Sequence, residues 1–266
     1  MITSFRLLLV LMLALSTTGF ASRFDEVPAW KSYFDEFNVT GGFALYDLKN
    51  DSYSFYNRAL FRTRFIPAST FKIPNSLIAL ETGVATDEHF LLKWDGVDRG
   101  SAGWNRDHDL ESAFKASAVW YYQEMARRVG ARRMQQWVSR LGYGNRSIKG
   151  GIDKFWLTGK LAISPEEQIG FLRRLHAGTL PVSKRSMDIL RRIMITEQTD
   201  SYTLRGKTGW ANSGNVDTGW YVGYLETKEN VYFFAIILPA NAPGNPDFGR
   251  SRVEITKRIL REKGVM

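Results

Sequence analysis

Apolar and polar residues alternate in short runs near both ends of the chain, which is the pattern of half-buried strands. Residues 43–48 and 52–56 form two such runs joined by Lys49-Asn50-Asp51, which predicts a hairpin. Three further strand-like runs occupy residues 202–210, 219–226 and 231–238, and the last two are joined by the polar residues 227–230. The sequence therefore predicts strands from both its N-terminal and its C-terminal segments.

From about Thr70 to Ile195 the apolar period changes to three or four residues, as at positions 122, 125, 126 and 129 and at 134, 137, 138 and 141. Ser164-Pro165 predicts the start of another helix, with Phe171 at the edge of its apolar stripe. A basic helix is expected from about Arg252 to Glu262. These patterns predict an α+β fold in which an antiparallel sheet, built from N- and C-terminal segments, carries an inserted helical lobe. The default site is the cleft between the two lobes.

The first residues indicate the compartment. Arg6 precedes nine apolar residues, 7–15, which are too few to span a bilayer because a spanning helix needs about 20 residues. Small residues Gly19 and Ala21 follow, as at a secretory cleavage site. We therefore expect residues 1–21 to be a cleaved signal peptide and residues 22–266 to be a single catalytic domain in the periplasm. No Cys is available near the cleavage site for a lipid, and no later segment has about 18 uncharged apolar residues, so no membrane anchor is expected.

Composition narrows the chemistry. The 266 residues include no Cys and only three His, which excludes thiol nucleophiles and Cys-ligated metals and disfavours a multi-His metal centre. The formal charge of +9 fits nucleic acid, a membrane surface or a small anionic substrate. Because a secreted protein rarely meets chromosomal DNA, we expect no nucleic-acid partner.

Ser-x-x-Lys places a hydroxyl and an amine on one helix face, where the amine or its derivative can take the hydroxyl proton. The pattern occurs twice, at Ser69-Thr70-Phe71-Lys72 and at Ser112-Ala113-Phe114-Lys115. The first follows a Pro-containing loop that can present Ser69 at a helix start. The second has no turn before it and is interpreted as a solvated or packing pair. Ser69 and Lys72 are therefore the candidate catalytic pair, although an ordinary N-cap serine is the alternative.

Lys207-Thr208-Gly209 lies inside a predicted strand, where a cation, a hydroxyl and bare backbone suit a carboxylate-bearing ligand. Alone, this tripeptide is common and is equally typical of an exposed strand end. Together with the upstream Ser-x-x-Lys, it is the signature of serine β-lactamases and penicillin-binding proteins. The combination predicts acyl transfer through an active-site serine.

The run from Pro67 to Ser76 resembles the class D β-lactamases, or oxacillinases. Further family-like elements follow in the family's order, namely Lys93–Gly96, Trp104–His108, Ser117-Ala118-Val119, Tyr143-Gly144-Asn145 and Phe155-Trp156-Leu157. The resemblance covers essentially the whole chain after residue 21. It implies a serine β-lactamase or penicillin-binding-protein transpeptidase-like fold, and hydrolysis of penicillin-type antibiotics that confers resistance. Class A is disfavoured because Ser-Asp-Asn and a Glu-x-x-Leu-Asn motif are both missing.

The resemblance also implies how Lys72 becomes a base. An ordinary Lys has a pKa of about 10.4 and is protonated at neutral pH. In class D enzymes this lysine is N-carboxylated by CO₂, so Lys72 is expected to carry a carbamate as general base, with no metal or other cofactor. Apolar walls at Val119 and Leu157 would favour the neutral amine, and the Trp156 indole N–H would hold the carbamate. Without the family, Trp156 would be interpreted as an ordinary core residue.

By the same resemblance, Ser117 passes a proton to the lactam nitrogen and Lys207 supports it. Thr208, Gly209 and an arginine of the last helix bind the substrate carboxylate; Arg252 fits the family spacing better than Arg250. The backbone N–H groups of Ser69 and Trp210 would form an oxyanion hole. We expect Trp104 to line the cleft, with an exposed structural role as the alternative, and Tyr143-Gly144-Asn145 to shape the cleft wall.

The residues from Trp210 to Thr218, with Gly214 near the middle, are expected to form a polar loop. Family members that hydrolyse carbapenems have a loop of similar length here, but this sequence lacks the basic and Pro residues of their loop. Turnover of penicillin and oxacillin is therefore expected, and carbapenem activity is left open. Two alternatives remain, a β-lactam-binding sensor domain and a D,D-peptidase that acylates without rapid turnover. The sequence leaves open whether the protein is a monomer or a homodimer.

Overall fold

A single mixed sheet organises the molecule. The computed structural model describes residues 23–213, 216–240 and 245–266, and in these residues seven strands pair in the order β1-β3-β2-β7-β6-β5-β4. The strands are β1 (Arg23–Glu26), β2 (Gly42–Asp47), β3 (Ser52–Tyr56), β4 (Ile195–Gln198), β5 (Tyr202–Ser213), β6 (Val216–Thr227) and β7 (Val231–Ala240). N- and C-terminal strands meet where β2 pairs with β7, as predicted. The predicted β2–β3 hairpin is also confirmed.

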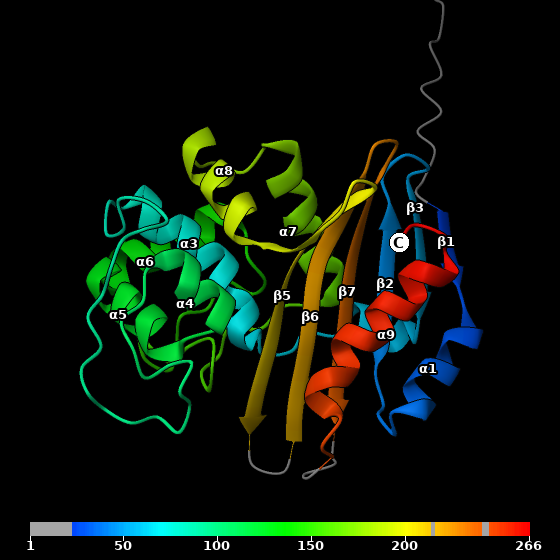
Figure 1. Ribbon diagram of the computed structural model, residues 1–266, viewed down its shortest axis with the longest axis horizontal. Helices are drawn as coiled ribbons and strands as arrows, with labels where there is room; N and C mark the ends of the chain where they lie inside the picture. The colour runs from blue at the N-terminus through cyan, green and yellow to red at the C-terminus, as the bar shows by residue number, and fades with distance from the viewer. Residues whose placement is uncertain (1–22, 214–215, 241–244) are drawn as a thin grey trace, which may run out of the picture.

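Helices cover both faces of the sheet (Figure 1). They are α1 (Lys31–Glu36), α2 (Arg58–Arg62), α3 (Lys72–Glu81), α4 (Leu110–Ala116), α5 (Val119–Val129), α6 (Ala131–Leu141), α7 (Pro165–Ala177), α8 (Lys184–Ile193) and α9 (Phe248–Glu262). Helices α1 and α9 pack together on one face. Helix α7 packs on β7, β6 and β2, within the core that the inserted lobe shares with the sheet. The α+β architecture predicted from the sequence is confirmed.

Four details of the prediction are wrong. The sheet is not purely antiparallel, because β1 runs parallel to β3. The final helix begins one turn earlier, at Phe248. Phe171 is buried rather than at the edge of its stripe, because its ring packs against Tyr143. Within the stretch predicted as a loop, residues 210–213 and 216–218 instead continue the β5–β6 ladder.

The polar ends of β5 and β6 are held by side chains as well as by the ladder. Asn212 pairs with Asp217, and the Asp217 carboxylate accepts hydrogen bonds from Asn212 Nδ2 and Trp210 Nε1. Polar residues are therefore compatible with strand here, because their side chains pair across the hairpin. The expected position of Gly214, and the signal peptide expected at residues 1–21, lie outside the described residues.

Local signals of the sequence explain how α7 begins. Ser164 Oγ accepts from Glu167 N, and the Glu167 carboxylate accepts from Ser164 N, which is a complete capping box with Pro165 at the first helical position. Behind this cap, Gln168, Ile169 and Leu172 are all buried. Helix α7 is thus fixed at its start and presents a buried face toward the sheet and the inserted lobe.

Candidate active site

A short turn presents Ser69 at the beginning of α3. Residues Ala68–Phe71 form a 3₁₀ turn that continues into α3 at Lys72, and Ala68 is in the left-handed region with φ of 49°. Such a conformation is costly for a residue other than Gly and persists where the surroundings enforce it. Ser69 is 8% exposed, and its Oγ lies 2.8 Å from Lys72 Nζ, which donates to it. The first Ser-x-x-Lys match therefore forms a contacting pair.

Lys72 is completely buried, and its Nζ lies 5.1 Å from the centre of the Tyr122 ring. Burial lowers the pKa of Lys72 well below its usual value, and the positive charge of Lys207 lowers it further. Removing an amine from water disfavours its charged form. The structure therefore favours a neutral amine at Lys72 that can accept a proton or react as a nucleophile.

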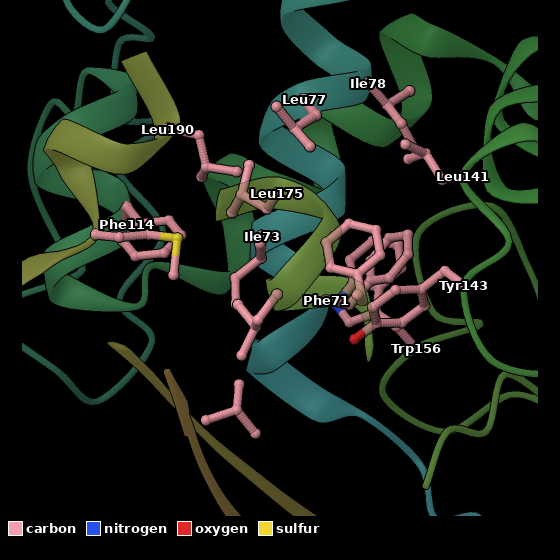
Figure 2. Close-up of a cluster of buried hydrophobic side chains, with 14 of the residues drawn as sticks. Phe71, Ile73, Leu77, Ile78, Phe114, Leu141, Tyr143, Trp156, Leu175 and Leu190 are labelled. Carbon is pink, nitrogen blue, oxygen red and sulfur yellow. The ribbon is translucent and has the colours of Figure 1, made fainter. Parts of the chain in front are cut away.

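Trp156 lies fully buried among aromatic rings, beside Phe71, the residue that precedes Lys72 (Figure 2). Its ring centre is 5.3 Å from that of Phe71 and 4.8 Å from that of Phe155. The Trp156 Nε1–H is buried and meets no hydrogen-bond acceptor among the described residues. Buried indole N–H groups normally have a partner, so the Trp156 N–H is a donor that can still donate to a hydrogen-bond partner. Val119, the first residue of α5, and Leu157 are both half-buried.

Ser117 terminates α4 in the left-handed conformation, with φ of 56° and ψ of 34°. The strand that carries Lys207 lies against the same helix, because Lys207 Nζ is 5.7 Å from the centre of the Phe114 ring. Unusual backbone conformations of this kind cluster at functional sites. Lys207 thus lies against the helix whose end is formed by Ser117.

Two buried basic side chains lie along β5, namely Lys207 of the strand itself and Arg252 of α9. Lys207 donates from Nζ to the Thr208 carbonyl at 3.1 Å, and burial together with the charge of Arg252 lowers the pKa of Lys207 to about 7. Arg252, in α9, is 7% exposed and donates from Nη1 to the Gly209 carbonyl. Burial lowers the pKa of Arg252 to about 10. Arg250 instead points to solvent and pairs with Asp247, so it does not reach β5.

Gly209 is where β5 contacts the Ala68–Phe71 turn that carries Ser69. A Cβ at this position would lie 3.0 Å from the Pro67 carbonyl oxygen and 3.1 Å from Thr70 Cγ2. The absence of a side chain therefore allows the strand and the turn to approach closely.

The two candidate tryptophans differ in their surroundings. Trp210 is 48% exposed, packs against Phe248 with tilted rings whose centres are 5.1 Å apart, and is held by the bond to Asp217 described above. Trp104 is half-buried; its Nε1 donates to the Ala116 carbonyl, and its own carbonyl accepts from Trp120 Nε1. Trp210 thus offers a fixed apolar surface beside Arg252, whereas Trp104 ties down the end of α4.

One expectation about this region is wrong. Tyr143 does not lie on the cleft wall but is completely buried, with its ring against Phe71 and Phe171. Its hydroxyl donates to Gln168 Oε1 at 3.4 Å. Asn145 is exposed, and its side chain donates to the Lys160 carbonyl and accepts from Ala162 N.

Sequence reasoning missed Gln168, which is buried and donates from Nε2 to Thr70 Oγ1 at 2.9 Å. Its position could have indicated this, because it precedes Leu172 by four residues and so shares the apolar face of α7. The second Ser-x-x-Lys match is a solvated or packing pair, as predicted, although the expectation that no turn precedes it is wrong, because a turn lies before α4, which begins at Leu110. Ser112 completes the cap of α4 with Asp109, and Lys115 pairs with Glu111.

Two negative observations apply to residues 23–213, 216–240 and 245–266. No group of three or more His, Asp or Glu side chains is placed to hold a metal ion. No helix in these ranges is long and apolar enough to cross a membrane.

Comparisons with known proteins agree on one family. The penicillin-binding-protein transpeptidase domain model matches residues 36–261. β-Lactamase OXA-48 of Klebsiella pneumoniae is 42% identical over 247 residues, which cover 92% of each chain. The crystal structure of a class D β-lactamase from Sebaldella termitidis matches with a TM-score of 0.88 and 38% identity, covering 92% of this chain and all of the other. The regulatory protein BlaR1 of Bacillus licheniformis is 33% identical over 241 residues, 90% of this chain but 39% of BlaR1.

Proposed function

The chain belongs to the class D β-lactamases, and we propose that it opens penicillin-type β-lactams through an acyl-enzyme on Ser69 with carboxylated Lys72 as general base, conferring antibiotic resistance. The observation that best supports this assignment is the 2.8 Å contact between Ser69 Oγ and the fully buried Lys72 Nζ. A hydroxyl becomes an effective nucleophile only when an adjacent group removes its proton. The contact supports Lys72 as the group that removes the proton.

Lys72 and its surroundings suit carboxylation by CO₂. Burial favours the neutral amine, which is the form that attacks CO₂ while losing a proton. Half-buried Val119 and Leu157 are the apolar side chains that we assign to the walls of this site. The unpartnered Trp156 Nε1–H is the donor expected for a carbamate oxygen. When present, the carbamate supplies a carboxylate-like base in place of the amine.

The remaining residues divide the reaction between the two lobes. The Ser69 Oγ attacks the lactam carbonyl carbon, and the backbone N–H groups of Ser69 and Trp210 stabilise the developing oxyanion; such donors contribute about 3–4 kcal/mol each. Ser117 delivers a proton to the lactam nitrogen as the C–N bond breaks. Lys207, which lies against the helix that ends at Ser117, supports this transfer electrostatically. Water then hydrolyses the Ser69 ester and releases the product.

Binding of the substrate carboxylate is assigned to Thr208, Gly209 and Arg252. Arg252 reaches the Gly209 carbonyl, so its guanidinium lies beside the strand along which the ligand would lie. A buried guanidinium strongly favours an anionic ligand because little water screens it. Trp210 provides an apolar surface for the rest of the substrate, and Trp104 lines the cleft only from its exposed part.

We also propose that residues 1–21 are removed as a signal peptide and that residues 22–266 act as one catalytic domain in the periplasm. The supporting pattern is Arg6 followed by nine apolar residues and the small residues Gly19 and Ala21. The penicillins are then met where they reach their cell-wall targets.

Nitrocefin turnover, with and without bicarbonate, tests the assignment. The wild-type protein is expected to turn over steadily, Ser69→Ala to be inactive, and Lys72→Ala to lose turnover. A stoichiometric burst without turnover would favour a β-lactam sensor or a D,D-peptidase, the first being the alternative to which the match with BlaR1 gives weight. Turnover that ignores bicarbonate and survives Lys72→Ala would overturn the carbamate mechanism.

A further inference from the structure

A buried polar network joins the turn that carries Ser69 to helix α7. Thr70 Oγ1 donates to the Pro67 carbonyl at 2.8 Å, and Thr70 N donates to the same oxygen at 3.1 Å. Gln168 Nε2 donates to Thr70 Oγ1, and the Tyr143 hydroxyl lies 3.4 Å from Gln168 Oε1. Thr70, Tyr143 and Gln168 are all fully buried. These bonds therefore form away from competing water.

The network constrains both sides of Ser69 in the sequence. Pro67 and Thr70 are tied together twice, and the residues between them are Ala68, in its left-handed conformation, and Ser69 itself. A left-handed alanine relaxes unless neighbouring contacts hold it. On the other side, Gly209 of β5 presses against Pro67 and Thr70. The turn is thus held between α7 and β5, and its orientation sets the direction of the Ser69 N–H.

Gln168 is the group that fixes the polarity of this network. Its amide can donate to Thr70 and accept from Tyr143 at the same time, which leaves the Thr70 hydrogen free to point at Pro67. A hydrocarbon side chain would do neither. A carboxylate would only accept, and the Thr70 hydrogen would turn toward it and away from the Pro67 carbonyl.

We propose that Gln168 is a positioning residue for the acylation reaction, acting through the Thr70 hydroxyl to hold the turn that aims the Ser69 N–H and Oγ. The inference rests on the proposed function, because it assigns Gln168 to the same Ser69 chemistry. Gln168 does not contact the reacting atoms or the substrate. We therefore expect it to affect the rates of acylation and deacylation, which both pass through a tetrahedral intermediate on Ser69, rather than the binding of the substrate. Misplacement of reacting groups by as much as 1 Å can cost about 100-fold in rate.

The test is single-turnover and steady-state kinetics of Gln168→Leu, corrected for active-site concentration by the acylation burst. Acylation and deacylation rate constants are expected to fall together by about 10- to 100-fold, with substrate dissociation constants unchanged. In a Thr70→Val background, adding Gln168→Leu should cost little more, because the hydroxyl through which it acts is already gone. Full additivity of the two losses would overturn the proposal.

Gln168→Glu supplies a readout that a purely structural role would not move. When protonated, the introduced carboxyl group can again donate to Thr70 and accept from Tyr143, so the acylation rate of this variant should approach that of the wild type as the pH falls. A rate ratio to wild type that stays flat with pH would count against the proposal.

Ser186→Ala is the matched control, because it removes a buried hydroxyl of α8 that donates to Glu81, away from the network. It should lower the thermal midpoint without changing rates per active site. If the wild-type protein fails to turn over nitrocefin, the proposed function fails. If it turns over and Gln168→Leu matches it per active site, only the role of Gln168 fails.

Discussion

Gly209→Ala tests the contact between β5 and the turn that carries Ser69. The added methyl group would lie 3.0 Å from Pro67 O, 3.1 Å from Thr70 Cγ2 and 3.2 Å from Thr70 N. Two of these three atoms belong to the backbone of a turn that is also tied to α7, so no flexible side chain can swing away. The turn must therefore move by a few tenths of an ångström, away from β5.

Overpacking of this kind costs about 1–3 kcal/mol. For a chain of this size each kcal/mol lowers the thermal midpoint by about 2–4 °C, so a fall of about 2–12 °C is expected. Displacing Ser69 relative to β5 also separates the two proposed oxyanion donors, and we expect acylation to slow by about tenfold. Thermal melts monitored by circular dichroism and stopped-flow acylation with nitrocefin measure the two effects.

Gly170→Ala is the matched control. A Cβ at Gly170 in α7 would meet nothing within 4 Å, so the same substitution should stabilise the helix by about 0.5–1 kcal/mol and leave the kinetics unchanged. If Gly209→Ala kept the wild-type midpoint and acylation rate, the steric argument for this glycine would be refuted.

Three further outcomes are expected. Trp156→Phe keeps the aromatic packing but removes the N–H. Because a hydrogen bond to a charged group contributes about 1.5–3 kcal/mol, the bicarbonate concentration that gives half-maximal turnover should rise about 10- to 150-fold. An unchanged dependence of turnover on bicarbonate would argue against the contact between Trp156 and a carbamate. Lys207, with a pKa of about 7, is cationic below that pH, so KM for penicillins should rise from pH 6 to pH 8. Arg252→Ala removes a positive charge that lowers the pKa of Lys207, so the midpoint of this rise in KM should shift to higher pH. If the midpoint were the same in the variant and the wild type, Arg252 would not influence the pKa of Lys207. Ser183→Ala removes the N-cap of α8 and should lower the thermal midpoint by about 2–4 °C. Its rate of nitrocefin turnover per active site should equal that of the wild type.

The lowered pKa of Lys207 also makes the stability of the protein depend on pH. The unfolded chain binds a proton at Lys207 up to a pH of about 10.4, whereas the folded chain releases it near pH 7. Because the unfolded state binds more protons between these values, the contribution of Lys207 to the free energy of unfolding increases with pH across that window.

The sequence predicted those features whose causes are local. Ser164-Pro165 with Glu167 is a helix start by itself, and the run around Lys49-Asn50-Asp51 is a hairpin by itself. Lys207-Thr208-Gly209 lies in a strand, as the pattern indicated. In each case the stabilising contacts join residues close in the chain, so the pattern contains the information.

What the sequence did not predict depends on distant partners. Nothing in Arg23-Phe24-Asp25-Glu26 is typical of a strand, and the segment becomes one because β3 offers a free edge. Tyr143 has an amphipathic side chain that suits a cleft wall equally well, and its hydroxyl can be buried because distant Thr70 and Gln168 give it polar partners. The polar ends of β5 and β6 looked like a loop because Asp217 and its two donors are brought together only after the strands pair.

The pairing of β2 with β7 also has a consequence for how the molecule folds. Gly42 pairs with Ile237, so the central ladder of the sheet closes only after nearly the whole chain has been synthesised. Such distant pairings give a high contact order and slow folding. Until they form, one edge of β2 is unpaired, and the sheet that holds β5 against the Ser69 turn is incomplete. A chain that stops before β7 is therefore expected to be both inactive and prone to aggregation.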